Sequence, residues 1–118
     1  MSWNESEILK ARQAILDAVQ DMLGGRLTYI EGARKIVAAW WASKLDERDA
    51  DFLPFVGINS ETETLPFGTM RTLWQPAALD ALQSEIDRME TWARRFGEVH
   101  CRNLVARFSS GQIKIEKF

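Results

Sequence analysis

Apolar positions recur at helical spacing in three stretches of the chain. In residues 5–23 and 28–44 they fall on one side of a helix, and in residues 76–108 they alternate at steps of three and four. The apolar seam of the third stretch consists of Leu79, Leu82, Ile86, Met89, Ala93, Phe96 and His100. Since one long helix cannot bury its own seam, the first two helices must cover it. The pattern predicts an all-α fold.

The residues between these stretches set the ends of the helices. Gly24 and Gly25 are typical of a helix end, and Thr28 with Glu31 has the spacing of a capping box that starts the next helix. The short connection predicts an antiparallel hairpin, packed on the long third helix. Pro76 suits the first turn of that helix, because its missing N–H needs no partner there.

Residues 46–75 lack a helical pattern, and we expect a long ordered aromatic loop that caps one end of the helices. Its apolar residues include two similar segments, Leu53-Pro54-Phe55 and Leu65-Pro66-Phe67. So many large apolar groups predict a loop anchored on the helices, with residues 59–64 as a polar tip. Residues 109–118 form a tail with strand-like alternation. The prediction is one helical domain over residues 1–118.

Three features of the helices each allow two interpretations. Trp40 and Trp41 continue the apolar stripe, which favours core packing over a stacking surface for a ligand. Gly97 indicates either a close helix crossing or a bend, and we favour the crossing. Arginines at 88, 95 and 102 could follow nucleic acid, but Glu90 before Arg94 and Glu98 before Arg102 favour ion pairs on an exposed face.

Composition narrows the class of protein. A net charge of −2 disfavours nucleic acid and anionic membranes as partners, and the longest apolar run, of seven residues at 36–42, is too short to cross a bilayer. The first residues lack the pattern of an export signal. We therefore expect a soluble, cytoplasmic protein. The single Cys101 excludes an internal disulfide.

Carboxylates are concentrated in the loop, at Asp46, Glu47, Asp49, Asp51, Glu61 and Glu63. Their spacing fits no calcium loop, so a solvated loop is the favoured interpretation, followed by a charged docking surface and then by a metal site. We expect no metal and no cofactor.

His100, the only histidine, lies on the apolar seam, which favours a core imidazole over a catalytic base. Cys101 follows it directly, and adjacent helical residues point in different directions, so a Cys–His pair is disfavoured.

The loop also carries a resemblance. Residues 51–68, Asp-Phe-Leu-Pro-Phe-Val-Gly-Ile-Asn-Ser-Glu-Thr-Glu-Thr-Leu-Pro-Phe-Gly, followed by Arg71 and Trp74, resemble a motif in a family of small uncharacterised bacterial helical proteins. The upstream Tyr-Ile-Glu-Gly-Ala-Arg ending at Arg34 is similar to that family as well. The resemblance implies a bacterial source and a helical domain, and it transfers no catalytic residue.

These observations favour an interaction module that presents the acidic loop to a protein partner, which would include an inhibitor or immunity-type role. The partner is another protein or a second copy of the chain. The alternative is a small hydrolase or ligand-binding protein with a pocket between loop and helices. We assign no catalytic residue. The candidate binding residues are Asp49, Asp51, Asn59, Ser60, Glu61, Thr62, Glu63, Arg71 and His100.

Overall fold

The computed structural model describes residues 4–65 and 76–115. Its elements are α1 (Glu5–Leu23), α2 (Tyr29–Trp40), the short 3₁₀ turn η2 (Trp41–Ser43), α3 (Leu53–Thr62) and α4 (Pro76–Ser109). No strand occurs among these residues. The predicted all-α fold is therefore confirmed, and the three long predicted helices begin and end close to the expected positions.

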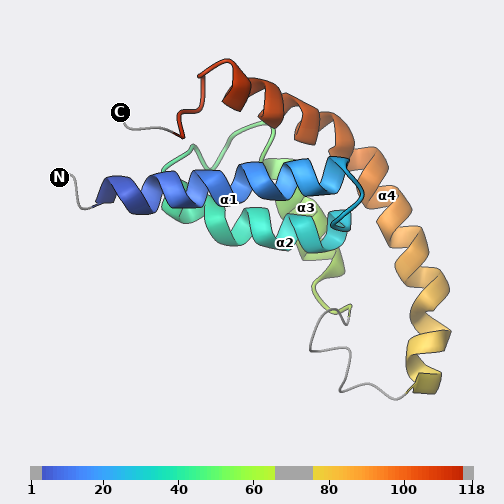
Figure 1. Ribbon diagram of the computed structural model, residues 1–118. Coiled ribbons are helices and arrows are strands. Elements are labelled where there is room, and N and C mark those ends of the chain that lie inside the picture. Colours follow the sequence, from blue (N-terminus) through green and yellow to red (C-terminus); the bar gives the residue numbers. More distant parts are fainter. Residues whose placement is uncertain (1–3, 66–75, 116–118) are drawn as a thin grey trace.

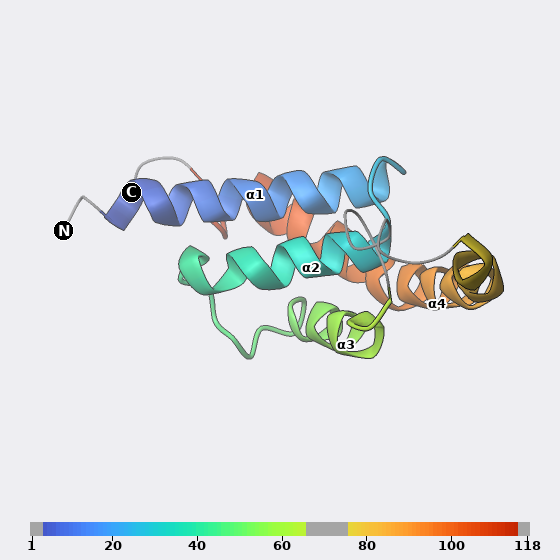
Figure 2. The same cartoon turned by 90° about the horizontal axis from the view of Figure 1, so that it is seen from below.

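Helices α1, α2 and α3 form one layer, and the long, curved α4 crosses it. Figure 2 shows α1, α2 and α3 side by side, with α4 crossing behind them. In Figure 1, α4 curves around this layer, and its first turns extend past the ends of the other helices. The hairpin of α1 and α2 packed on one long helix matches the prediction.

The start of α2 is held by groups from two helices. The Thr28 hydroxyl oxygen accepts the Glu31 backbone N–H at 3.0 Å, so the predicted capping box is present. The carboxylate of Glu90, from α4, accepts the backbone N–H groups of Tyr29 and Ile30 at 2.8 and 3.1 Å. Because a helix N-terminus attracts negative charge, Glu90 fixes the position of α4 against α2. It is therefore not free for the predicted pairing with Arg94.

Gly97 lies where α4 packs most closely on the other helices. A Cβ atom at this position would lie 3.2 Å from a ring carbon of Phe55 and 3.3 Å from Ile58 and Tyr29. These distances are shorter than ordinary van der Waals contact, so glycine allows the close approach. The geometry supports the close-crossing interpretation.

The expected thirty-residue loop is wrong for residues 53–62, which form α3. Pro54 lies in the first turn, where proline is tolerated, and Phe55, Ile58 and Thr62 are buried at helical spacing. Gly57 disfavours a helix in isolation, but the packing of α3 against α2 and α4 outweighs that cost. The segment packs against the side of the hairpin and does not cap its end.

The two adjacent tryptophans have different surroundings. Trp40 is 1% exposed and belongs to the core, as predicted, whereas Trp41 is 75% exposed, so core packing is wrong for Trp41. The α2 helix ends at Trp40, and η2 then turns the chain. The change of backbone geometry removes Trp41 from the buried stripe.

The seam of α4 that faces the core is rotated from the predicted one. Its buried residues are Ile86, Ala93, Gly97, Cys101, Leu104 and Phe108. Phe96 is 44% exposed and His100 is half-buried, so both lie at the edge of the contact. The side chain of Leu79 lies outside what the structure describes. After α4, Ile113 is 2% exposed and its N–H bonds to the Arg107 carbonyl oxygen, which anchors part of the predicted tail.

Candidate functional site

A network of charged and polar side chains joins the segment before α3 to the last third of α4. The Arg107 guanidinium donates to both oxygens of Asp49, at 2.9 and 2.7 Å, and to Asp51 at 3.1 Å. The amide of Asn103 donates to Asp51 at 2.9 Å, and Nδ1 of His100 lies 2.9 Å from the same carboxylate. His100, Asn103 and Arg107 occur at steps of three and four, so one face of α4 presents all three.

The network is largely shielded from water. The side chains of Asp49 and Asp51 are 11% and 13% exposed, and that of Arg107 is 21% exposed. The backbone N–H of Asp51 also donates to Asp49 at 2.8 Å, which shapes the turn that leads into α3. Hydrogen bonds to ionised partners in such surroundings are strong, so the network fixes the chain before α3 on α4.

Burial and hydrogen bonding act in opposite directions on these carboxylates. Burial raises the pKa of Asp49, but the bonds from Arg107 and from the Asp51 backbone outweigh it and hold the pKa below 3.8. Burial likewise raises the pKa of Asp51, and the bonds from His100, Asn103 and Arg107 lower it below the same value. The two aspartates also raise the pKa of Arg107. These pKa shifts favour the charged forms of Asp49, Asp51 and Arg107.

Acid should weaken this network. A carboxylate whose pKa is lower in the folded state stabilises the fold above the unfolded pKa, near 4, and that contribution disappears as the pH falls through the folded pKa. We expect the free energy of unfolding to decline below about pH 4, measured by urea unfolding at several pH values. The Asp49→Asn, Asp51→Asn variant should be less stable at pH 7 and show a shallower decline. A control variant, Asp80→Asn, Asp87→Asn, should keep the wild-type slope because it leaves the network intact. Equal slopes in wild type and in Asp49→Asn, Asp51→Asn would contradict the assignment.

The structure brings together only some of the predicted binding residues. Asp49, Asp51 and His100 all belong to the network. Asp51 is bonded to both His100 and Arg107, and Asp49 is bonded to Arg107. Thr62 is 0% exposed and its hydroxyl donates to the Ile58 carbonyl oxygen at 2.7 Å, so its predicted place in an exposed tip is wrong.

The remaining predicted residues lie along or beyond α3. Asn59 is half-buried, and Ser60, Glu61 and Glu63 are exposed on the second half of α3 and just after it. Arg71 lies outside the described residues. Asp49 and Asp51 thus lie in the internal network, whereas Glu61 and Glu63 are exposed.

Cys101 has the surroundings of a core residue. It is 0% exposed, and burial raises the pKa of its thiol to about 12. A thiol in this state stays protonated at neutral pH and is a poor nucleophile. The expectation that Cys101 and His100 form no catalytic pair agrees with this geometry.

A second feature is an exposed apolar surface that we call the aromatic face. It consists of Leu53 on α3 and of Trp92, Phe96 and Val99 on α4. The rings of Trp92 and Phe96 stack with centroids 5.6 Å apart and planes 11° apart. Leu53 and Val99 are 50% and 53% exposed, so the face is open to solvent although its side chains are large and apolar.

α3 is held beside this face. A Cβ atom on Gly57 would lie 3.9 Å from the Phe96 ring, and the network bonds the start of α3 to residues further along α4. The two helices therefore run in opposite directions, with Gly57 leaving room for Phe96. Sequence reasoning missed the aromatic face, although Trp92, Phe96 and Val99 recur at steps of four and three beside the predicted seam.

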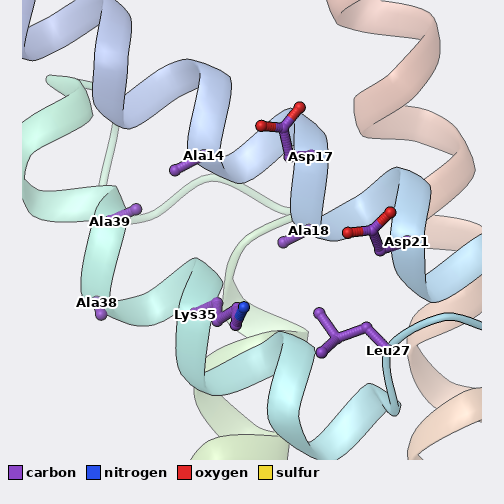
Figure 3. Close-up of a pocket in the computed structure, with 8 residues that line it drawn as sticks. All are labelled: Ala14, Asp17, Ala18, Asp21, Leu27, Lys35, Ala38 and Ala39. Atoms are coloured by element: carbon purple, nitrogen blue, oxygen red, sulfur yellow. The ribbon is translucent and has the colours of Figure 1, made fainter.

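A groove of about 500 Å³ lies between α1 and α2. Figure 3 shows its lining residues, which are Ala14, Asp17, Ala18, Asp21, Leu27, Lys35, Ala38 and Ala39. Asp17 accepts a hydrogen bond from Gln13 and Asp21 pairs with Arg26, so both carboxylates are already bonded to their own helix or its end. The groove shares no lining residue with the network, and its polar side chains do not meet at a common point (Figure 3).

The described residues, 4–65 and 76–115, contain no group of three His, Cys, Asp or Glu side chains that could hold a metal ion. Within the same ranges, no helix has the length and apolar character needed to cross a membrane. Comparison with protein-family models, curated proteins and solved structures finds no match to this chain.

Proposed function

We propose that this chain is a protein-interaction module and that its partner docks on the aromatic face. The stacked pair of Trp92 and Phe96 carries the proposal, since the two residues are 37% and 44% exposed. Aromatic residues, and tryptophan above all, contribute much of the binding energy in protein interfaces. A stacked pair is also restricted in rotation, so it loses little entropy when a partner covers it.

The charged network supports the proposal because it gives the face a rigid frame. Arg107 holds the chain before α3 on α4 through Asp49 and Asp51. On α3, Leu53 is one helical turn before Gly57, the residue that faces Phe96. A surface that is already ordered loses less conformational entropy when a partner binds. On this proposal the ion pairs of Arg107 with Asp49 and Asp51 position the docking surface and do not themselves contact the partner.

The docking surface differs from the acidic tip expected from the sequence. Asp49 and Asp51 are bonded internally, and Glu61 and Glu63 remain as an acidic border of the face. Following the loop resemblance, we extend the proposal to a bacterial, cytoplasmic protein of the inhibitor or immunity type, which acts by covering a surface of its partner. A hydrolase has less support, because the carboxylate beside His100, that of Asp51, is already bonded to Arg107.

The proposal is tested by photo-crosslinking in the cells from which the chain comes. The photoreactive amino acid p-benzoylphenylalanine replaces Trp92, and in a control protein it replaces Gln20, which is exposed on α1. We expect a crosslinked adduct from position 92 and none from position 20. If neither position 92 nor position 99 gives an adduct, the aromatic face is not a docking surface.

A further inference from the structure

The exposed side of α4 carries a second stripe with the spacing of a helix-pairing seam. Its residues are Trp92, Phe96, Val99, Asn103 and Ala106, which are all exposed and follow one another at alternating steps of four and three. A repeat of 3.5 residues keeps the contact side of one helix facing another over several turns. This stripe lies apart from the buried seam of Ala93, Cys101 and Leu104. α4 thus has the pattern of a helix with two packed sides.

The two borders of the stripe differ in charge. Arg88, Arg95 and Arg102 follow one border at intervals of seven. α3 forms the other border, where Glu61 is one helical turn after Gly57 and therefore level with Trp92. Arg95 and Glu61 are exposed, and neither forms an ion pair with a residue that the structure describes. One basic and one acidic border thus flank an apolar centre.

This arrangement is complementary to itself. A two-fold axis along the stripe keeps the two α4 helices parallel and places the basic border of each copy against the acidic border of the other. An antiparallel pair would instead place Arg95 on the arginine side of the other copy, away from Glu61, and would lose this attraction. We infer that the partner on the aromatic face is a second copy of this chain, with its α4 parallel to the first. This inference rests on the proposed function.

Sedimentation equilibrium of the purified chain over a range of concentrations tests the inference. We expect the wild type to dimerise and Val99→Asp to be monomeric, because the substitution buries a carboxylate in the centre of the stripe. Glu61→Arg and Arg95→Glu should each weaken dimerisation by about tenfold or more, since each change occurs twice in a symmetric dimer. The combined variant Glu61→Arg, Arg95→Glu should restore dimerisation, because it exchanges the two charges.

Disulfide crosslinking tests the parallel orientation. Val99→Cys and Ala106→Cys, made separately, should both form disulfide-linked dimers, since in a parallel pair each position meets its own copy. In an antiparallel pair at most one of them can do so. The native Cys101 is 0% exposed and does not compete, and Gln20→Cys on α1 is the control that should stay unlinked.

The outcomes separate this inference from the proposed function. If the wild type is monomeric at every concentration and photo-crosslinking from position 92 gives an adduct with another protein, the second copy is wrong and the docking face stands. If it is monomeric and neither position 92 nor position 99 gives an adduct, both are wrong. A wild-type dimer that is unaffected by Val99→Asp would mean that the copies meet on another surface, which also overturns the inference.

Discussion

Replacing Trp40 with alanine is expected to lower the free energy of unfolding by about 4 kcal/mol. The indole is 1% exposed and stacks on Phe52, with ring centroids 4.3 Å apart and planes 7° apart. Its N–H donates to the Asp46 carbonyl oxygen at 2.9 Å. The substitution therefore leaves a large cavity and removes a bond that holds the chain after η2. The loss is a large share of the stability of a small domain.

The neighbouring tryptophan is a matched control for this prediction. Trp41 is 75% exposed, and its ring centroid lies 5.7 Å from the Lys44 amine. Trp41→Ala should change the free energy of unfolding by less than about 1 kcal/mol. Urea unfolding followed by circular dichroism compares the two variants. If they lose similar stability, the assignment of Trp40 to the core and of Trp41 to the surface is wrong.

Arg107→Met should lower the free energy of unfolding by about 3 kcal/mol. Methionine keeps much of the side-chain volume, so the loss reports the charge and the hydrogen bonds. Asp49 and Asp51, at 11% and 13% exposure, would keep their negative charges without the guanidinium that both now share. A partly buried carboxylate without its partner is strongly unfavourable.

Arg102→Met is the matched control on the same helix. Arg102 pairs with Glu98 at 3.6 Å, but both side chains are well exposed, so its removal should change stability by less than about 0.5 kcal/mol. The triple variant Arg107→Met, Asp49→Asn, Asp51→Asn should recover part of the loss, because no unpaired carboxylate remains. Equal unfolding midpoints for Arg107→Met and Arg102→Met would contradict a stabilising network.

The sequence was sufficient to predict the helices whose signals are local. The capping box of Thr28 and Glu31, the glycine pair after α1 and Pro76 at the start of α4 each act within one or two turns. Long apolar periodicity made the hairpin and the long helix recognisable. α3 was missed because its ten residues contain Pro54 and Gly57, and its helical state depends on packing against α2 and α4.

The candidate site was only partly predictable for a related reason. Asp49, Asp51 and His100 were chosen for their chemistry, but Arg107 lies 56 residues from Asp51 in sequence, and its contact depends on the tertiary fold. Glu90 similarly has a helical partner in sequence, Arg94, yet bonds to the start of α2. Local ion-pair rules cannot anticipate a more favourable distant partner.

The aromatic face shows a third limit of periodicity. Phe96 was assigned to the core seam because it lies three residues after Ala93 and four residues before His100. A helix with apolar residues on two sides gives two overlapping patterns, and the sequence does not tell which side faces the core. Gly97 decides the orientation, because a side chain at this position would press on Phe55 and Ile58 of α3 and on Tyr29 of α2.

The central claim is that α4 packs on the core with one side and forms a docking surface with its outward side. Photo-crosslinking from position 92 in the source cells is its most direct test, because it reports what covers the face where the protein acts. The account predicts a discrete adduct from position 92 and none from position 20. If the proteins with the photoreactive residue at position 92 or at position 99 remain without a crosslink after full illumination, the claim is contradicted.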